Sequence, residues 1–412
     1  MSGQSEQNRQ GKKKIAFINQ RYGAEVAGGS ESYTRAVAEH LAKRYAQKLS
    51  VEVLTSKAID FATWADAYPE AVKQLHGVTV RRFPVKHKRS RILQRGMQIF
   101  KTHLHIQTRS MEKLRLKARG PYVPGLVEYI RKHKDEYDAF VFVTYLYYPA
   151  YFGAREVYEK AYFIPTAHDE EPIYADIFRE LFCRVKGIIY LTEEEKLFVE
   201  KTFHNEAVQS RVLGMGIEVP QYADANRFRK KYAITGEYLL YAGRIEEGKG
   251  CKQLIDSFLK YRRRLKAEGS QRELKLVLMG KGTMQIPENE AIIYVGFVPD
   301  EDKYDGMAGA RIICLPSRFE SFSISLLEGM AYGKPALVNG HCEVLKGHIQ
   351  RSGAGFAYTD DEGFQNGIGQ LWDEAVYQEM GKRAADYVKG QYSWEKMTEE
   401  LCDMLLGSGE QK

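Results

Sequence analysis

The stretch that decides the fold is residues 312–329, IICLPSRFESFSISLLEG. It begins with four apolar residues, as expected for a short strand buried on both faces of a parallel sheet. A polar loop follows, and the apolar residues after it predict a helix over residues 325–332. Glu320 in the loop and Glu328 in the helix are therefore expected at the carboxyl end of a strand, where open α/β sheets bind their ligands.

A second unit of this kind lies upstream, where an apolar strand at 238–241 leads into the loop AGRIEEGKG and then a helix at 251–265. Glycines permit tight turns, and the start of a helix offers free N–H groups to an anion. Arg244 and Lys249, five positions apart on this loop, can both reach one diphosphate. A third loop, Gly296-Phe297-Val298, follows a strand at 292–295, and its backbone can pair with the edge of a nucleobase.

Short apolar runs recur along the whole chain, with helical patterns such as 30–45 and 394–406 between or after them. The further expected strands are 15–18, 50–54, 78–83, 139–143, 162–164, 187–191, 274–279 and 335–338. This alternation predicts doubly wound parallel α/β sheets. Because 412 residues exceed one ordinary core, we expect a domain at 1–216, a second at 217–390, and a C-terminal helix at 391–412 that crosses back to the first.

The sequence of the second half resembles the nucleotide-sugar domain of the GT-B glycosyltransferases, most closely the retaining family 4. The resemblance rests on the G-R-x(4)-K-G loop, the G-x-V turn, and two glutamates separated by seven residues, preceded by Pro-Ser and followed by GMAYGKP. It extends over roughly residues 236–360 and is weaker in the first half. It implies two Rossmann-like domains facing a cleft.

The activity that the resemblance implies is a retaining, metal-independent transfer of a sugar from a nucleotide-diphosphate donor, with no cofactor. The acceptor would be a hydroxyl of a saccharide, a lipid-linked saccharide or a secondary metabolite. In the residues that match, Arg244 and Lys249 neutralise the donor diphosphate, and Glu320 contacts hydroxyls of the donor sugar. Glu328 holds the ribose, and Val298 meets the base through its backbone. The other donor-binding residues expected around the start of the helix are Ser321, Phe322, Ser323 and Ile324.

The first half also carries two matches to the family. Gly28 and Gly29 resemble the glycine-rich turn that approaches the donor phosphate or the acceptor. His168, at the exit of a strand, is similar to the family's histidine near the transferred sugar, and Asp169 is expected to position it. The expected catalytic residues are therefore His168, Glu320, Arg244 and Lys249. The sequence departs from the family in having Ser323 where many members have glycine, and Met215-Gly216 where Asn-Gly is usual.

The charge of the chain is +7 overall but is unevenly distributed. Residues 81–119 contain thirteen Lys or Arg and one acid, Glu112. Apolar residues recur at nearly helical spacing from Leu93 to Leu114, so one interpretation is a basic amphipathic helix on an anionic membrane surface. A helix packed on its own domain, or a contact with a phosphorylated acceptor, are the alternatives. The aromatic residues within 145–152 could stack on a sugar, but for most of them packing in the hydrophobic core is the expectation.

Two other functions stay open. One is a GT-B sugar-nucleotide epimerase, and the other is a non-catalytic nucleic-acid-binding protein that uses residues 81–119, although that segment has few aromatic residues for stacking. The five dispersed cysteines predict neither a disulfide framework nor a metal site. The sequence has no stretch with the length and hydropathy of a signal peptide or a membrane span, so we expect a cytoplasmic protein, peripheral on the cytoplasmic membrane face if the basic segment binds lipid.

Overall fold

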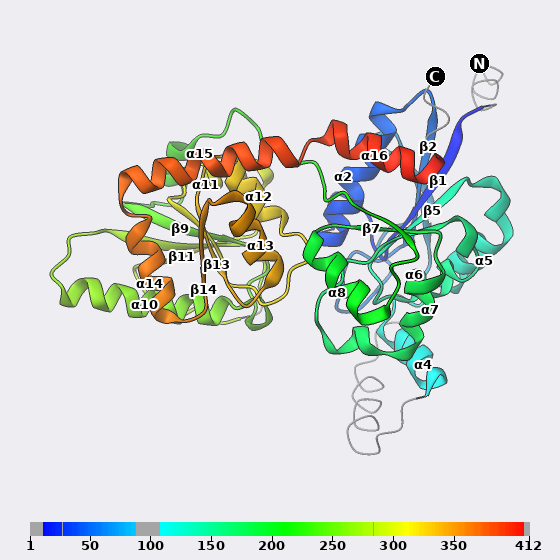
Figure 1. The fold of residues 1–412 in the computed structure, drawn as a ribbon, viewed down its shortest axis with the longest axis horizontal. Coiled ribbons are helices and arrows are strands. Elements are labelled where there is room, and N and C mark those ends of the chain that lie inside the picture. The colour runs from blue at the N-terminus through cyan, green and yellow to red at the C-terminus, as the bar shows by residue number, and fades with distance from the viewer. Residues whose placement is uncertain (1–10, 27, 88–107, 283, 408–412) are drawn as a thin grey trace. The chain divides into compact units, whose positions relative to one another are not determined.

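The computed structural model describes residues 11–26, 28–87, 108–282 and 284–407, which form two compact units (Figure 1). Unit 1 comprises Met1–Met215 and Glu395–Lys412, and unit 2 comprises Gly216–Trp394. The chain therefore passes between the units twice. The return lies at residues 394–395, later than the expected 390, because helix α15 (Glu374–Gln391) packs on helix α12 (Ile324–Ala331) of unit 2.

The core of unit 1 is an eight-stranded sheet with the order β3-β4-β2-β1-β5-β6-β7-β8. All neighbouring strands are parallel except the edge pair β3–β4. The strands are β1 (Lys13–Ile18), β2 (Leu49–Ser56), β3 (Val72–Leu75), β4 (Val78–Phe83), β5 (Ala139–Val143), β6 (Ala161–Ile164), β7 (Gly187–Tyr190) and β8 (Gln209–Val212). The order reverses between β1 and β5, which places a ligand-binding crevice of this fold class at their carboxyl ends.

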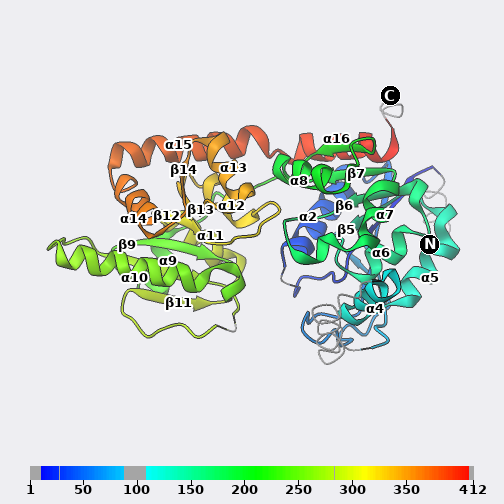
Figure 2. The same cartoon turned by 60° about the horizontal axis from the view of Figure 1, so that its bottom comes forward.

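Helices cover both faces of this sheet (Figures 1 and 2). Side chains of α5, α6, α7 and α8 pack with the central strands into one buried cluster. On the other face the start of α16 meets the end of α2, where Arg44 pairs with Glu395, and the Tyr162 hydroxyl donates to the Leu405 carbonyl near the end of α16. The helices of unit 1 are α2 (Gly29–Arg44), α4 (Arg109–Arg119), α5 (Pro124–His133), α6 (Tyr148–Ala154), α7 (Asp176–Arg184), α8 (Glu193–Phe203) and α16 (Trp394–Leu406).

Unit 2 is built on a six-stranded, wholly parallel sheet with the order β11-β10-β9-β12-β13-β14. Counted along the chain, this is the strand order 3-2-1-4-5-6 of dinucleotide-binding Rossmann domains. Its strands are β9 (Glu237–Ala242), β10 (Leu274–Met279), β11 (Ile292–Gly296), β12 (Ile312–Leu315), β13 (Ala336–Asn339) and β14 (Gly355–Tyr358). Its remaining helices are α9 (Ala225–Lys231), α10 (Cys251–Ala267), α11 (Asp300–Gly309), α13 (Glu343–Ser352) and α14 (Asp361–Gln370).

Every strand expected from an apolar run is present, while three further strands were missed: β3, β8 and β14. All three lie at a sheet edge, where half of the backbone and many side chains remain outside the core. Their sequences, VKQL, QSRV and GFAY, are correspondingly short or polar, so hydrophobic runs do not reveal them.

The basic segment 81–119 is not a single helix, since Arg81 and Arg82 belong to β4. Arg81 pairs with Glu52, and Arg82 is buried against the ring of Tyr68. Helix α4 forms the end of the segment; it buries Leu116 and leaves Leu114 exposed. Most of the expected amphipathic helix, residues 88–107, lies outside the described residues. In the described ranges no helix is long and apolar enough to cross a membrane.

Candidate functional site

The candidate donor-binding site lies at the carboxyl ends of β9 and β12, which are neighbours in the sheet of unit 2. The strand order reverses between these two strands, so their loops diverge and leave room for a ligand at this edge. The loop after β9 contains Arg244 and the 3₁₀ turn Glu247–Lys249, and the loop after β12 contains Glu320. Gly250 lies so close to the second loop that a Cβ there would be 2.4 Å from the Pro316 carbonyl oxygen.

The structure brings Lys249 and Glu320 together. The Lys249 ammonium lies 2.7 Å from Glu320 Oε1 and 3.3 Å from the Phe319 carbonyl oxygen. Both side chains are largely shielded, with 22% and 17% of their surfaces exposed. A shielded cation beside a carboxylate can bind a phosphate oxygen and a sugar hydroxyl at adjacent positions, because each group makes charge-assisted hydrogen bonds.

Arg244 has a different environment. Its guanidinium pairs with Glu246 of its own loop at 3.0 Å, and 60% of the side chain is exposed. Arg244 therefore lies on the same loop as Lys249, but it forms its ion pair with the neighbouring acid Glu246. An exposed ion pair of this kind contributes little free energy, so an incoming diphosphate can replace Glu246 at small cost.

Ser323 caps helix α12 in a left-handed backbone conformation, with φ 66° and ψ 67°. Glycine is favoured there because it has no Cβ to clash, which explains why the family usually has glycine at this position. The Ser323 side chain is buried, and within the described chain its hydroxyl has no hydrogen-bond partner. This hydroxyl lies at a helix N-terminus, whose free N–H groups attract anions.

The loop before α12 is held in place by a contact with His348. This buried imidazole contacts the Phe322 carbonyl oxygen through Nε2 at 3.0 Å and the Tyr387 hydroxyl through Nδ1 at 3.0 Å. Burial, with a smaller contribution from Arg351, lowers the pKa of His348 to about 4. His348 is therefore neutral near pH 7, and Nε2 is assigned as the protonated nitrogen because a carbonyl can only accept.

Glu328 lies on α12, and Val298 lies in the turn between β11 and α11. The Glu328 carboxylate accepts from the Lys303 ammonium at 2.6 Å and from the Tyr304 hydroxyl at 3.3 Å, both on α11. Val298 is buried next to Phe297, which is 62% exposed. Gly296 has φ 72°, so the turn after β11 takes a conformation that suits glycine. Glu328 therefore pairs with α11 and not with Lys249.

The glycine turn of unit 1 precedes α2, at the carboxyl end of β1. Gly28 is packed against a buried ion pair, in which Arg21 Nε lies 2.9 Å from Glu31 Oε1. A Cβ on Gly28 would be 2.2 Å from Glu31 Oε2, whereas a Cβ on Gly29 would meet nothing within 4 Å. A side chain at Gly28 would therefore displace the end of the Glu31 side chain from its pair with Arg21, whereas one at Gly29 would enter open space.

His168 follows β6, and Glu170 Oε1 lies 3.6 Å from its Nε2. The carboxylate of Asp169, which was expected to position His168, accepts from the Tyr174 hydroxyl. The loop itself is supported by Glu195, whose two oxygens accept from the backbone N–H groups of Ala167 and Leu191 at 2.6 Å each. Burial raises the pKa of Glu195 to about 8, although these N–H groups favour the carboxylate.

Three supporting residues, Lys303, His348 and Glu195, escaped the sequence analysis. Of these, Glu195 carried a usable signal: Thr192-Glu193-Glu194-Glu195 has the S/T-x-x-E pattern of a capping box. The Thr192 hydroxyl does accept from the Glu195 N–H, but the carboxylate accepts from the N–H groups of Leu191 and of Ala167, which lies in the loop after the neighbouring strand β6. Contacts of that kind depend on the sheet order, which the local pattern does not reveal.

Comparison with known proteins agrees with this geometry. Residues 224–389, which lie within unit 2, match the family model of the glycosyl transferases group 1. Among curated proteins, mannosylfructose-phosphate synthase of Agrobacterium fabrum is 23% identical over 214 residues, which are 46% of this chain and 47% of that protein. The chain thus spans about half the length of this relative.

Solved structures resemble the whole chain. Sucrose-phosphate synthase of Thermosynechococcus elongatus superimposes with a TM-score of 0.69 and 16% identity, covering 95% of this chain and 98% of that one. The Anabaena protein HepE in complex with UDP-glucose gives a TM-score of 0.66 at 14% identity, covering 95% and 99%. The fold is therefore GT-B, and residues 224–389 match the family model of the glycosyl transferases group 1.

Proposed function

We propose that the protein is a retaining glycosyltransferase that moves a sugar from a nucleotide-diphosphate donor to an acceptor hydroxyl, without a metal. The observation that carries this proposal is the Lys249–Glu320 pair, which lies beside the start of α12 where the strand order reverses. A nucleoside diphosphate sugar needs a cationic site for its phosphates and an adjacent carboxylate for its hydroxyls. HepE, of the same fold, has been solved with UDP-glucose, which supports this donor class.

Cleavage of the anomeric bond leaves negative charge on the departing diphosphate. We assign Lys249, Arg244 and the N–H groups at the start of α12 to stabilise that charge as it develops. The hydroxyl of Ser323, which has no partner within the described chain, is a further donor for a phosphate oxygen. Because Glu320 is already engaged with Lys249, we assign it to orient the sugar and not to attack it.

In this mechanism the acceptor hydroxyl attacks from the face that the diphosphate leaves, and a phosphate oxygen takes its proton. Glu328 is assigned to the ribose and Val298 to the base, while Gly28, Gly29 and His168 are the residues of unit 1 assigned to the donor or acceptor. The acceptor class that we propose is a saccharide or a lipid-linked saccharide. We place the protein in the cytoplasm, peripherally associated with the cytoplasmic face of the membrane.

A thermal-shift panel of nucleoside diphosphates and nucleotide sugars tests the donor site. A ligand at 100 times its Kd should stabilise the protein by about 2.7 kcal/mol. Lys249→Ala and Glu320→Ala should abolish or reduce this shift. Lys252→Ala is the matched control, because Lys252 lies three residues away on the surface and pairs only with Asp256 among the described residues.

The outcomes separate the alternatives. A shift that Lys249→Ala removes and Lys252→Ala retains supports the donor site and identifies the base. If no nucleotide at millimolar concentration stabilises the wild type, the proposed donor site is wrong. Conversion of a nucleotide sugar to its epimer in the absence of any acceptor would favour the epimerase.

A further inference from the structure

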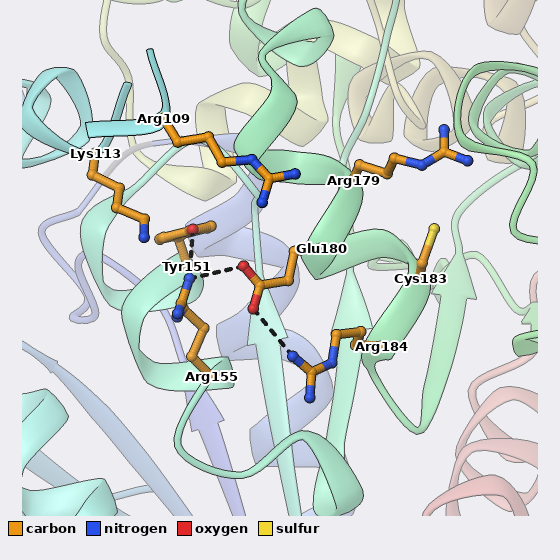
Figure 3. A pocket seen from close by; sticks show the side chains of 8 residues that line it. All are labelled: Arg109, Lys113, Tyr151, Arg155, Arg179, Glu180, Cys183 and Arg184. Carbon is orange, nitrogen blue, oxygen red and sulfur yellow. Dashed lines mark hydrogen bonds and ion pairs between the residues drawn. The ribbon is translucent and has the colours of Figure 1, made fainter. Parts of the chain in front are cut away.

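A strongly cationic hollow of about 550 Å³ lies in unit 1, among helices α4, α6 and α7 (Figure 3). Five of its lining residues are cations and one is an acid, so the hollow has a net charge of +4. The cations are Arg109, Lys113, Arg155, Arg179 and Arg184, and Glu180, Tyr151 and Cys183 complete the lining. None of these residues belongs to the proposed donor site, which lies in unit 2.

The positive charge of this hollow is poorly neutralised by the protein. Glu180 is shared between Arg155 at 2.8 Å and Arg184 at 3.3 Å. Among the described residues, no carboxylate forms an ion pair with Arg109, Lys113 or Arg179, and Figure 3 shows Arg109 and Lys113 extending from α4 on one side of the hollow. Unpaired cations that converge on a concave surface attract anions.

The acid of α4, Glu112, makes its described hydrogen bonds to α7 and not to the cations of the hollow. Glu112 is buried and accepts from the backbone N–H groups of Asp176 and Ile177 at 3.3 and 3.1 Å, where it caps α7. This contact fixes α4 against the start of α7. It thereby sets Arg109 and Lys113 opposite the later turns of α7 and removes the charge that would otherwise neutralise them.

The hollow extends along α7, away from the start of that helix. Helix α7 begins at Asp176, soon after the His168 loop, and the lining residues on it run from Arg179 to Arg184. At 1.5 Å per residue, Arg184 lies about 12 Å along the helix from Asp176.

We propose that this hollow is a second anion site, which binds a phosphate or diphosphate group. Guanidinium groups suit this ligand because their planar N–H pairs match two phosphate oxygens at once. The same chemistry can come from a phosphorylated solute or from the headgroup of an anionic lipid. The site is independent of glycosyl transfer, and it gives the residues of α4 within the basic segment 81–119 a defined role.

Cys183 provides the readout, because it lines the hollow and is exposed while the other four cysteines are buried. The assay follows its alkylation by neutral iodoacetamide, with and without pyrophosphate at constant ionic strength. A second arm uses vesicles of phosphatidylcholine with and without phosphatidylglycerol. We expect slower alkylation with pyrophosphate, with the phosphatidylglycerol vesicles, or with both, and the effective arm identifies the source of the phosphate.

The variants make the result specific. Arg109→Gln with Lys113→Gln should require at least about tenfold more ligand for half-protection, because two charge-assisted contacts are lost. Lys201→Gln, on the exposed surface of α8, removes one charge of the same unit and should change nothing. Lys249→Ala should also retain the protection, so failure of the donor site leaves this result intact. Equal protection in the double variant, or no protection in either arm, would overturn the proposal.

Discussion

The left-handed conformation of Ser323 predicts that replacing this residue by glycine stabilises the protein. An L-residue in this conformation costs about 1–2 kcal/mol relative to glycine. A buried hydroxyl without a partner costs about 1–3 kcal/mol more. The greater freedom of glycine in the unfolded chain opposes these gains by about 0.5–1 kcal/mol. We therefore expect Ser323→Gly to raise the free energy of unfolding of unit 2 by about 1–4.5 kcal/mol.

Urea denaturation, followed by tryptophan fluorescence and by hydrogen exchange of unit 2 peptides, measures this change. Ser323→Ala separates the two contributions, because it removes the hydroxyl but keeps the Cβ. Ser325→Gly is the matched control: it makes the same exchange within helix α12, where glycine should cost up to about 1 kcal/mol. If Ser323→Gly destabilises the protein as much as Ser325→Gly does, the strain that we infer at Ser323 is absent.

The same substitution should weaken nucleotide binding several-fold if the Ser323 hydroxyl donates to a phosphate. Stability and binding would then change in opposite directions, as is common where strained residues are retained at ligand sites. Isothermal titration of Ser323→Gly with the nucleotide found in the thermal-shift panel measures this loss. Unchanged affinity would assign the serine to a role outside phosphate binding.

Three further perturbations test the residues around the loop before α12 and around the loop that carries His168. His348 has a folded pKa of about 4 against an ordinary value near 6.5, so the unfolded chain binds its proton first as the pH falls. The free energy of unfolding should therefore drop by about 2 kcal/mol between pH 7 and pH 5, and His348→Gln should remove this part of the slope in urea titrations. Glu195→Ala leaves two backbone N–H groups without their acceptor and should cost at least about 2 kcal/mol, measured in the same way, whereas an unchanged midpoint would mean that the His168 loop does not depend on it. His168→Ala should lower kcat at least about tenfold without altering nucleoside diphosphate affinity, and weaker nucleotide binding would contradict its assignment to the transferred sugar.

The sequence predicted the buried centre of both sheets well. The strands β5, β10 and β12 begin and end at the expected residues, because strands covered on both faces are largely continuous apolar runs. The loops after β9 and β12 were recognised from Arg244, Lys249 and Glu320, and the sheet order places these loops side by side. What sequence spacing could not supply was the choice of partner among several nearby charges.

That choice depends on tertiary contacts. Asp169 and Glu170 are neighbours in sequence, yet Asp169 accepts from the Tyr174 hydroxyl, and Glu170 lies next to His168. Glu112 is the one acid among thirteen cations between residues 81 and 119, and a surface salt bridge would be the simple expectation. Instead it is buried under α7, which only the packing of α4 reveals.

The return of the chain to unit 1 has a consequence for how the protein is made. Unit 1 is interrupted after Met215 and completed only by α16, about 180 residues later, whereas unit 2 is one continuous segment. At about 5–20 residues per second, the ribosome needs roughly 10–40 seconds to supply that helix after the rest of unit 1 has emerged. During this interval the surface around Tyr162 and Gly187 lacks its cover, so unit 2 can be complete before unit 1 is.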